Sequence, residues 1–325
     1  MSIQYYEASQ NSELYTKPVF LYYACMWLAV AEFLFKGTGD VSLDRARGEN
    51  KHHGLEFVID SSKFTYDALE FAEKLRAKPM ISSGRYKGTF ELWRQTARKM
   101  PLCGDFTEVF GMGNATGVRP LFHSEDRPPI PLESTGTSLI DCWGRIPFMV
   151  RPLTDCGWIS DFLRTTITAI SGGVENYITT SIMVHPCDPA KEIEFTERFL
   201  FDPNDIENIN FTKFPSGFSL QTKSPKVGLG LRRFDHRGAV EFPDGCNYGD
   251  QVWMYNGAIE YTEFENIYIS LYILSNLSRY YPDFWIDHTT NHTLFSDLCD
   301  QFLSESAESI ARLAYSELSR TYHFR

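Results

Sequence analysis

The feature that most constrains the fold is an apolar run near the start of the chain, Val19–Phe35. It is about 17 residues long, somewhat short for a membrane-spanning helix. Glu32 interrupts it, and Tyr22, Tyr23 and Trp27 lie in its central part. Its apolar residues recur at three- and four-residue spacing, as they do on one face of a helix. The sequence therefore predicts an amphipathic helix buried in a protein core, with no membrane partner.

The same periodicity predicts further helices at both ends of the chain. In the N-terminal part they cover Ser62–Lys78 and Ser82–Lys99. Near the C-terminus, Ile267–Leu277 is apolar almost all round, which indicates an enclosed central helix. A last helix is expected over Thr293–Ser319.

The middle of the chain, residues 101–250, has a different character. Glycine and proline are frequent and divide it into short segments. Alternating or β-branched residues predict strands over Phe148–Pro152, Tyr177–Val184, Phe218–Thr222 and Ala239–Phe242, and a short helix over Asp161–Ile170. We expect an α+β protein in which the N- and C-terminal helices, residues 1–100 and 251–325, form a common helical bundle, and residues 101–250 form a mixed α/β insertion with long loops. The alternative is two sequential domains divided near Pro101.

Composition narrows the classes of function. With 43% hydrophobic residues and 15% aromatic residues, the chain has enough apolar side chains for a large core. Its net charge of −11 argues against broad non-specific binding to nucleic acid, although a local basic groove remains compatible with it. The seven cysteines are scattered and form no CxxC pair, which indicates free thiols. The start of the chain lacks a signal-peptide pattern, so we expect a cytoplasmic protein.

Two blocks of sequence resemble a known family. The first is the Lys17-Pro-Val-Phe-Leu-Tyr-Tyr helix, a glycine stop and then Lys51-His-His-Gly-Leu55. The second is Leu271–Pro282, which contains Ser-Arg-Tyr-Tyr-Pro and is followed by Trp285. Both are similar to the YaaC-like family of bacterial proteins, which is functionally uncharacterised. Membership would leave the activity open.

A weaker likeness concerns HEPN-type helical bundles, which include RNA-cleaving enzymes and phage-defence proteins and which use an Arg-x(4–6)-His motif. Arg47 and His52 fit that spacing, with His53 as a variant partner. A histidine with a near-neutral pKa supplies a base for the 2′-hydroxyl, and an arginine stabilises the charged phosphorane, so no metal is needed. The alternative is that Arg47 is a solvated loop charge and that His52 or His53 caps or packs against the next helix.

Arg279 follows the apolar helix Ile267–Leu277 and is a further candidate. A cation is favoured at a helix C-terminus, so a capping role, with Asp283 as a carboxylate partner, competes with a catalytic one. If the terminal helices pack together, Arg279 would approach His52.

A basic cluster in the middle segment is the candidate for nucleic-acid binding. It comprises Arg232, Arg233, His236 and Arg237, with Phe234 among them and Gly228 and Gly230 before them. Cations can contact phosphates while an aromatic ring stacks on a base. The alternative is a solvated loop.

No metal or cofactor site is expected. His288 and His292 have HxxxH spacing, but the glutamate of HExxH is absent and Thr-Thr-Asn is a poor helix interior. The glycine-rich stretches 111–117 and 226–230 lack the context of a dinucleotide or phosphate loop.

These observations lead to two hypotheses about function. The resemblances imply an RNA- or nucleotide-directed effector, in phage defence or stress. The rival is a non-catalytic interaction or scaffold protein that forms a homo-oligomer or binds a partner protein, which the acidic balance favours.

Overall fold

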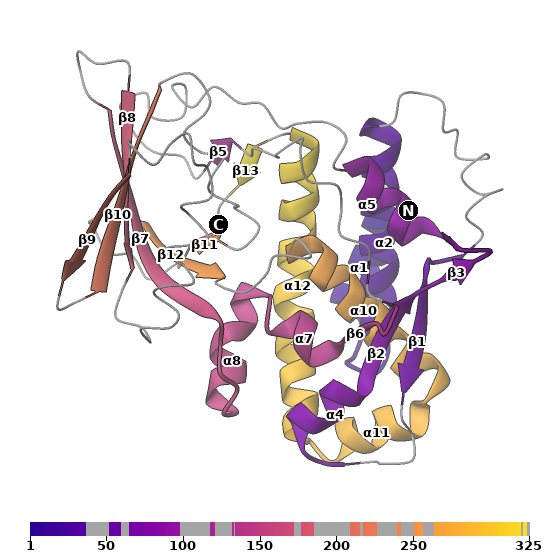
Figure 1. Ribbon diagram of the computed structural model, residues 1–325. Coiled ribbons are helices and arrows are strands. Elements are labelled where there is room, and N and C mark those ends of the chain that lie inside the picture. The colour runs from indigo at the N-terminus through magenta and orange to yellow at the C-terminus, as the bar shows by residue number, and fades with distance from the viewer. Residues whose placement is uncertain are drawn as a thin grey trace. The chain divides into compact units, whose positions relative to one another are not determined.

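A computed structural model describes the two ends of the chain and parts of the middle segment. The described residues are 1–36, 52–59, 65–97, 118–120, 132, 134–171, 177–184, 209–214, 217–225, 239–241, 250–255, 263–319 and 321–323. The chain forms two compact units. Unit 1 comprises residues 1–100, 125–160 and 260–319, and unit 2 comprises residues 101–124, 161–259 and 320–325. The combination of helices with mainly separate antiparallel sheets makes the protein α+β (Figure 1).

Unit 1 is built mainly from helices. They are α1 (Ser2–Gln10), α2 (Lys17–Lys36), α4 (Ala68–Lys74), α5 (Thr89–Ala97), α7 (Leu139–Trp143), α8 (Val150–Asp155), α10 (Glu263–Tyr280), α11 (Pro282–Thr290) and α12 (Leu294–Ser319), with a 3₁₀ turn over Pro147–Met149. The expected helices over Val19–Phe35, Ile267–Leu277 and Thr293–Ser319 are confirmed as α2, α10 and α12.

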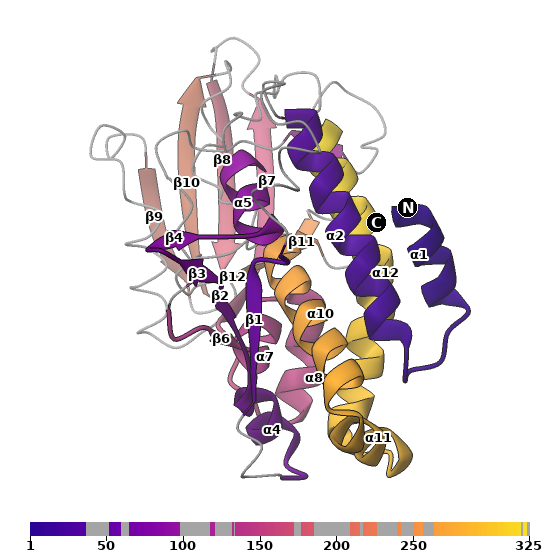
Figure 2. The same cartoon turned by 90° about the vertical axis from the view of Figure 1, so that its right-hand side faces the viewer.

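Helix α2 runs through the core of unit 1. It packs against α1, α5, α10 and α12, as the two perpendicular views of Figures 1 and 2 illustrate. Small residues such as Ala24 and Ala29 are fully buried along it, which allows its neighbours to approach closely. Helix α10 is buried from Glu263 to Leu277, which matches its apolar character on all sides.

By length and composition alone, α2 also passes as a membrane span. Its segment Lys17–Phe35 has a mean hydropathy of 1.6, and half of the most apolar window is buried inside the protein. Glu32 is fully buried and accepts a hydrogen bond of 2.7 Å from Trp93 Nε1 in α5. A buried carboxylate requires a hydrogen-bond partner, and Trp93 of the neighbouring helix supplies one within unit 1.

A small antiparallel sheet completes unit 1. Strand β2 (Leu75–Pro79) lies between β1 (Leu55–Ile59) and β6 (Thr137–Ser138), with Leu55 opposite Pro79 and Arg76 opposite Ser138. Beyond β2, the strands β3 (Ile81–Ser82) and β4 (Arg85–Tyr86) form a hairpin.

The expected helix over Ser62–Lys78 is wrong at its C-terminal end. Helix α4 covers only Ala68–Lys74, and the chain changes to strand β2 at Leu75. Leu75, Ala77 and Pro79 are buried while the residues between them are not, so a two-residue period takes over. Proline at 79 also disfavours a helical conformation for the residue before it.

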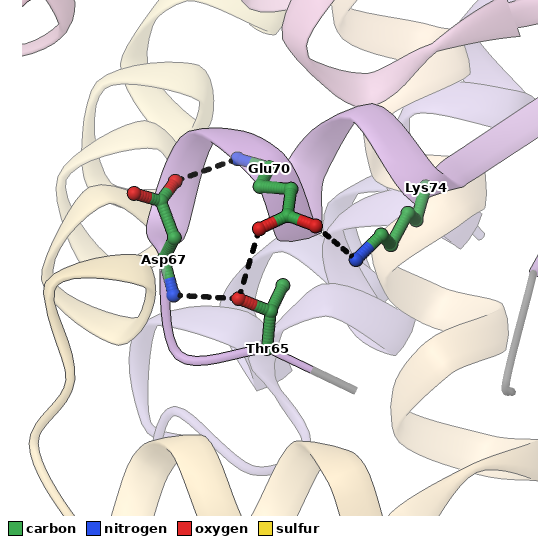
Figure 3. A network of polar contacts seen from close by, with 4 residues as sticks. All are labelled: Thr65, Asp67, Glu70 and Lys74. Carbon is green, nitrogen blue, oxygen red and sulfur yellow. Dashed lines mark hydrogen bonds and ion pairs between the residues drawn. The ribbon is translucent and has the colours of Figure 1, made fainter. Parts of the chain in front are cut away.

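A polar network shows why α4 begins at Ala68 (Figure 3). Asp67 Oδ1 accepts a hydrogen bond of 2.8 Å from the Glu70 backbone N–H, so Asp67 is the N-cap. The Thr65 hydroxyl donates to Glu70 Oε2 over 3.1 Å and accepts from the Asp67 N–H over 3.2 Å. Lys74 Nζ pairs with Glu70 Oε1 at 2.6 Å, which closes the network along the helix.

The expected helix over Ser82–Lys99 is also shorter than predicted. Helix α5 spans Thr89–Ala97, and the preceding residues belong to the β3–β4 hairpin. Ser83 and Gly84 have positive φ values of 53° and 70°, which suit a tight hairpin turn and not a helix.

Unit 2 contains an antiparallel six-stranded sheet in the order β11-β12-β7-β8-β10-β9. The strands are β7 (Phe162–Ser171), β8 (Tyr177–Val184), β9 (Ile209–Phe214), β10 (Gly217–Pro225), β11 (Ala239–Glu241) and β12 (Asp250–Tyr255). A separate pair joins β5 (Val118–Pro120) to β13 (Thr321–His323). The strands expected at Tyr177, Phe218 and Ala239 are therefore confirmed.

Two predictions for the middle segment are wrong. Asp161–Ile170 is strand β7 and not a helix, because its run of threonine and isoleucine is β-branched and pairs with β8 and β12. Phe148–Pro152 is helical and not a strand. Pro147 and Pro152 lack the N–H groups that a strand ladder uses, whereas proline fits the first turn of a helix.

Residues 125–160 lie in unit 1, although the sequence groups them with the expected insertion 101–250. The reason is burial: Leu139, Ile140 and Trp143 of α7 are almost fully buried, and α7 packs against α10 and α4. The common bundle of N- and C-terminal helices stays a prediction.

Candidate functional site

The segment His52–Gly54 is held in place by its own backbone. The carbonyl of His52 accepts a hydrogen bond of 3.1 Å from the Thr89 N–H, and that of His53 accepts one of 3.1 Å from the Phe90 N–H. These are N–H groups at the start of α5, which have no partner within a helix. The two histidines therefore lie at the N-terminus of α5, and their carbonyl groups accept hydrogen bonds from its first N–H groups.

The glycine after the histidines has a structural reason. Gly54 and Gly88 have positive φ values of 90° and 101°, which glycine adopts readily. A Cβ atom placed on Gly88 would lie 2.2 Å from Gly54 Cα. No larger residue fits this crossing of two backbones, so the glycine of the KHHGL segment is explained by packing.

The His53 ring lies among tyrosines from two helices. Its centroid is 5.5 Å from that of Tyr22 and 6.2 Å from that of Tyr23, both in α2. It is also 6.2 Å from Tyr272 in α10. The Tyr272 hydroxyl donates a hydrogen bond of 2.6 Å to the Leu55 carbonyl, which ties α10 to the strand after His53.

Arg279 reaches the same group of rings from the end of α10. Its Nε donates to the Ser275 carbonyl over 3.1 Å, and its Nη1 donates to the Tyr23 hydroxyl over 3.4 Å. The guanidinium carbon is 5.9 Å from the Tyr23 ring centroid and 5.1 Å from that of Tyr280. Both rings are within the range of cation–π attraction.

Within the described parts of the chain, Arg279 forms no ion pair with a carboxylate, and the expected pair with Asp283 is not present. The charge of Arg279 therefore faces aromatic rings and an imidazole.

The electrostatics keep His53 neutral near neutral pH. Burial lowers the pKa of its imidazole below the usual 6.5, and the nearby charges of Arg279 and His52 lower it further. Burial raises the pKa of the Tyr272 hydroxyl to about 12, so that group stays protonated. The cluster thus presents a neutral base beside a permanent cation.

The cluster can be reached from solvent. His52 is exposed, while His53, Tyr23 and Arg279 are half-buried. Tyr280 exposes 65% of its surface. His53 and Arg279 therefore lie at the edge of the core of unit 1 and not inside it.

The sequence-predicted residues have different positions relative to this cluster, which we call the His53–Arg279 site. It contains His53 and Arg279, with His52 beside it. Arg47 lies outside the described residues, and so does the basic cluster of Arg232, Arg233, His236 and Arg237. Sequence reasoning treated the paired tyrosines as family marks and missed their place around the imidazole. The Tyr-Tyr and Arg-Tyr-Tyr motifs were the available signal.

The structure does not place the two imidazoles of the HxxxH pair on one helix face. Helix α11 ends at Thr290, and His292 follows it with a φ of 47°. His288 is buried, with Nδ1 2.8 Å from the Thr293 hydroxyl and its ring 4.4 Å from that of Phe71. No group of three metal-binding side chains occurs among the residues that the structure describes.

A second cluster of charges lies in the core of unit 1. Arg94 of α5 is fully buried; its Nε is 3.1 Å from Glu265 Oε1, and its Nη1 is 3.4 Å from Glu91 Oε2. We call these three residues the Arg94 cluster. Its carboxylates neutralise the cation and accept hydrogen bonds from Nε and Nη1, which offsets the cost of burying a guanidinium.

The sequence was compared with known proteins. Residues 1–318 match the family model described as YaaC-like Protein. The comparisons find no matching curated protein and no matching solved structure.

Proposed function

This chain belongs to the YaaC-like protein family, and on that premise we propose that it is an RNA- or nucleotide-directed effector acting through the His53–Arg279 site. One observation carries the proposal: a neutral imidazole and a guanidinium, which has no carboxylate partner among the described residues, share the same tyrosine, Tyr23. Phosphodiester cleavage without a metal requires a base and a group that stabilises the charged phosphorane, and an imidazole with a guanidinium can supply both.

The reaction follows from their chemistry. The neutral His53 imidazole takes the proton of a ribose 2′-hydroxyl, and the 2′-oxygen attacks the adjacent phosphorus. Arg279 stabilises the additional negative charge on the phosphorane. The bond to the 5′-oxygen then breaks, and that oxygen takes a proton from the exposed His52 or from water. The products are a 2′,3′-cyclic phosphate and a 5′-hydroxyl.

The likeness to HEPN-type bundles supports the same reaction class by analogy alone. Under this proposal Arg47, the first residue of the Arg-x4-His motif that ends at His52, supplies a second cation. Arg232, Arg233, His236 and Arg237 contact the phosphates of a longer strand. A common bundle of N- and C-terminal helices, a cytoplasmic location and a role in phage defence or stress are parts of the same proposal.

The rival function is a non-catalytic interaction protein that forms a homo-oligomer or binds a partner protein. The net charge of −11 favours it, because a polyanion is repelled by most of such a surface. Several helices also expose large apolar side chains, such as Ile3 at 72%, Ile286 at 49% and Leu294 at 51%. Apolar residues of this kind supply contact area in protein interfaces.

Incubation of the purified protein with a single-stranded RNA in EDTA separates the two functions. We expect products that end in a 2′,3′-cyclic phosphate, and a rate lower by about 10²–10⁴-fold in His53→Ala, the range typical of general-base removal. Arg279→Ala should show a comparable loss. His292→Ala removes an exposed histidine outside the site and serves as the matched control.

Two results would contradict the proposal. If the wild-type protein neither cleaves RNA nor binds a mononucleotide, the interaction protein is the better account. If His53→Ala and Arg279→Ala cleave as fast as the wild type, the reaction takes place elsewhere in the chain.

A further inference from the structure

The β3–β4 hairpin projects from the end of β2 in unit 1 (Figure 1). Ile81 pairs with Tyr86 and Ser82 with Arg85, and the Lys87 N–H donates to the Met80 carbonyl over 2.9 Å at its base. Every residue from Ile81 to Tyr86 is exposed. The hairpin therefore presents its side chains to solvent and contributes little to the core.

The hairpin is positively charged in an acidic protein. Between Glu73 and Glu91 the chain has no carboxylate and has the cations Lys74, Arg76, Lys78, Arg85 and Lys87. Three of these cations are engaged: Lys74 with Glu70, Lys78 with Glu56 at 4.0 Å, and Arg76 with the Gly136 carbonyl.

The remaining two cations, Arg85 and Lys87, lie on the hairpin. Within the described part of the chain, neither forms an ion pair or a side-chain hydrogen bond. Tyr86 lies between them and exposes 36% of its surface. Two available cations with an exposed aromatic ring are the elements that bind single-stranded nucleic acid, through phosphate contacts and base stacking.

The base of the hairpin is fixed to the segment that carries His53. The Met80 N–H donates to the Gly54 carbonyl over 3.0 Å. Gly88, directly after Lys87, packs against the Gly54 backbone so closely that a Cβ atom would clash at 2.2 Å. The cations of the hairpin are therefore held at a set position relative to the imidazole.

We propose that the β3–β4 hairpin is an arm that binds a single strand of RNA, with Arg85 and Lys87 on its phosphates and Tyr86 on a base, while the reacting phosphodiester lies at His53 and Arg279. This inference rests on the proposed function and names its substrate as a polymer. Arg85 precedes Gly88 by three residues, a span of up to about 10 Å in an extended chain. A mononucleotide held at His53 does not extend that far, whereas neighbouring phosphates of a strand do.

Binding measured as a function of salt tests the arm. The probe is a fluorescent 12-nucleotide RNA with 2′-O-methyl groups, which cannot be cleaved by attack of a 2′-hydroxyl, and the protein is the full chain. Each lost phosphate contact lowers the slope of log K against log salt by about 0.7 for a single strand. We therefore expect Arg85→Ala/Lys87→Ala to lower that slope by about 1.4. Tyr86→Ala should weaken binding about tenfold and leave the slope unchanged, since stacking involves no counterion.

A double variant with the same net charge serves as the control. Lys17→Ala/Arg151→Ala removes two cations from α2 and α8, away from the hairpin, and should bind with the slope of the wild type. If Arg85→Ala/Lys87→Ala keeps the wild-type slope, the arm is overturned. If this variant and the control lower the slope equally, the arm is also overturned, since general charge then explains the effect.

A second measurement tests the proposed function separately from the hairpin. Wild-type cleavage of a ribodinucleotide involves His53 and Arg279 but offers the hairpin no second phosphate. If the wild type cleaves the dinucleotide and the hairpin variant keeps the wild-type salt slope, the proposal of an RNA-binding arm is overturned and the proposed cleavage is not. Absence of both cleavage and RNA binding overturns both ideas. Binding of the hairpin to vesicles of phosphatidylserine and phosphatidylcholine, without RNA binding, would identify a lipid surface and also overturn the arm.

Discussion

Two arginines have opposite surroundings: Arg94 of α5 lies against the first turn of α10, and Arg279 lies in the last turn of α10. Arg94 contacts Glu265 in the first turn of α10, is fully buried and has two carboxylate partners. Arg279 lies in the last turn, is half-buried and faces tyrosines, a carbonyl and an imidazole. A cation neutralised inside a core stabilises the fold and has no capacity left for a ligand. A cation at the surface that is not paired with a carboxylate can still attract a negatively charged ligand.

The largest effect should come from breaking the buried cluster. We expect Arg94→Leu to lower the free energy of unfolding by about 3–5 kcal/mol, because the carboxylates of Glu91 and Glu265 are left buried without their cation. Urea denaturation followed by circular dichroism measures this. Arg151→Ala removes an exposed arginine and should have little effect. A loss below about 1 kcal/mol in Arg94→Leu would show that the two arginines are less different than their surroundings indicate.

The next largest effect concerns the support of the exposed cluster. Gly88→Ala should lower the free energy of unfolding by on the order of 2–4 kcal/mol, because the new Cβ atom collides with Gly54 and the positive φ is strained. Gly84→Ala is the matched control: its φ is 70°, but no atom lies within 4 Å of the added Cβ. It should lose only about 1 kcal/mol, the cost of the left-handed conformation. Equal losses in the two variants would refute the close crossing of the backbones.

A smaller effect is expected from pH. The imidazoles of His53 and His288 have pKa values lowered mainly by burial, so the unfolded chain takes up these protons at a higher pH than the folded protein. Their contribution to stability is full above the unfolded pKa near 6.5 and is lost as the pH falls below it. Urea denaturation between pH 7.5 and 5 measures the decline, and His53→Gln should make it shallower. An identical decline in this variant would mean that the His53 pKa is unchanged on folding.

The smallest effect on stability should come from Arg279→Leu, because its hydrogen bonds to the Ser275 carbonyl and the Tyr23 hydroxyl and its contacts with the Tyr23 and Tyr280 rings lie at the surface, where water can replace them. The same substitution should raise the pKa of His53, because the positive charge that opposes its protonation is removed. An NMR titration of the histidine ring protons measures this, with Arg151→Ala as the control. A His53 pKa equal to that of the wild type would show that the charge of Arg279 does not act on the imidazole, and would argue against the proposed site.

The sequence predicted the long helices well, because the apolar periodicity of α2, α10 and α12 extends over many turns. It failed where a short segment is decided by its partners. Leu75 lies on the apolar face of the preceding helical pattern, but Leu75–Pro79 pairs with β1 and β6 in a sheet. Strand β7 is a different case, because its β-branched run favours a strand locally and pairing with β8 and β12 completes it.

The sequence offered four candidate residues, Arg47, His52, His53 and Arg279, but it did not predict which of them lie near one another. His53 and Arg279 were named from their residue types and from the motifs around them. Their convergence depends on how α2 and α10 pack, and the two residues lie near opposite ends of the chain. The tyrosines that fill the space between them gave an aromatic signal in the sequence, but that signal could not be assigned to a site without the fold.

The crossing of Gly54 and Gly88 has a mechanical consequence. Two backbones in direct contact leave no side chain between them to rotate or compress, so the joint behaves as a rigid coupling. A pull on the hairpin by a bound strand would be transmitted to the peptide unit next to His53. Under the proposed binding mode, the joint that excludes larger residues would connect the load on the arm to the backbone beside the imidazole.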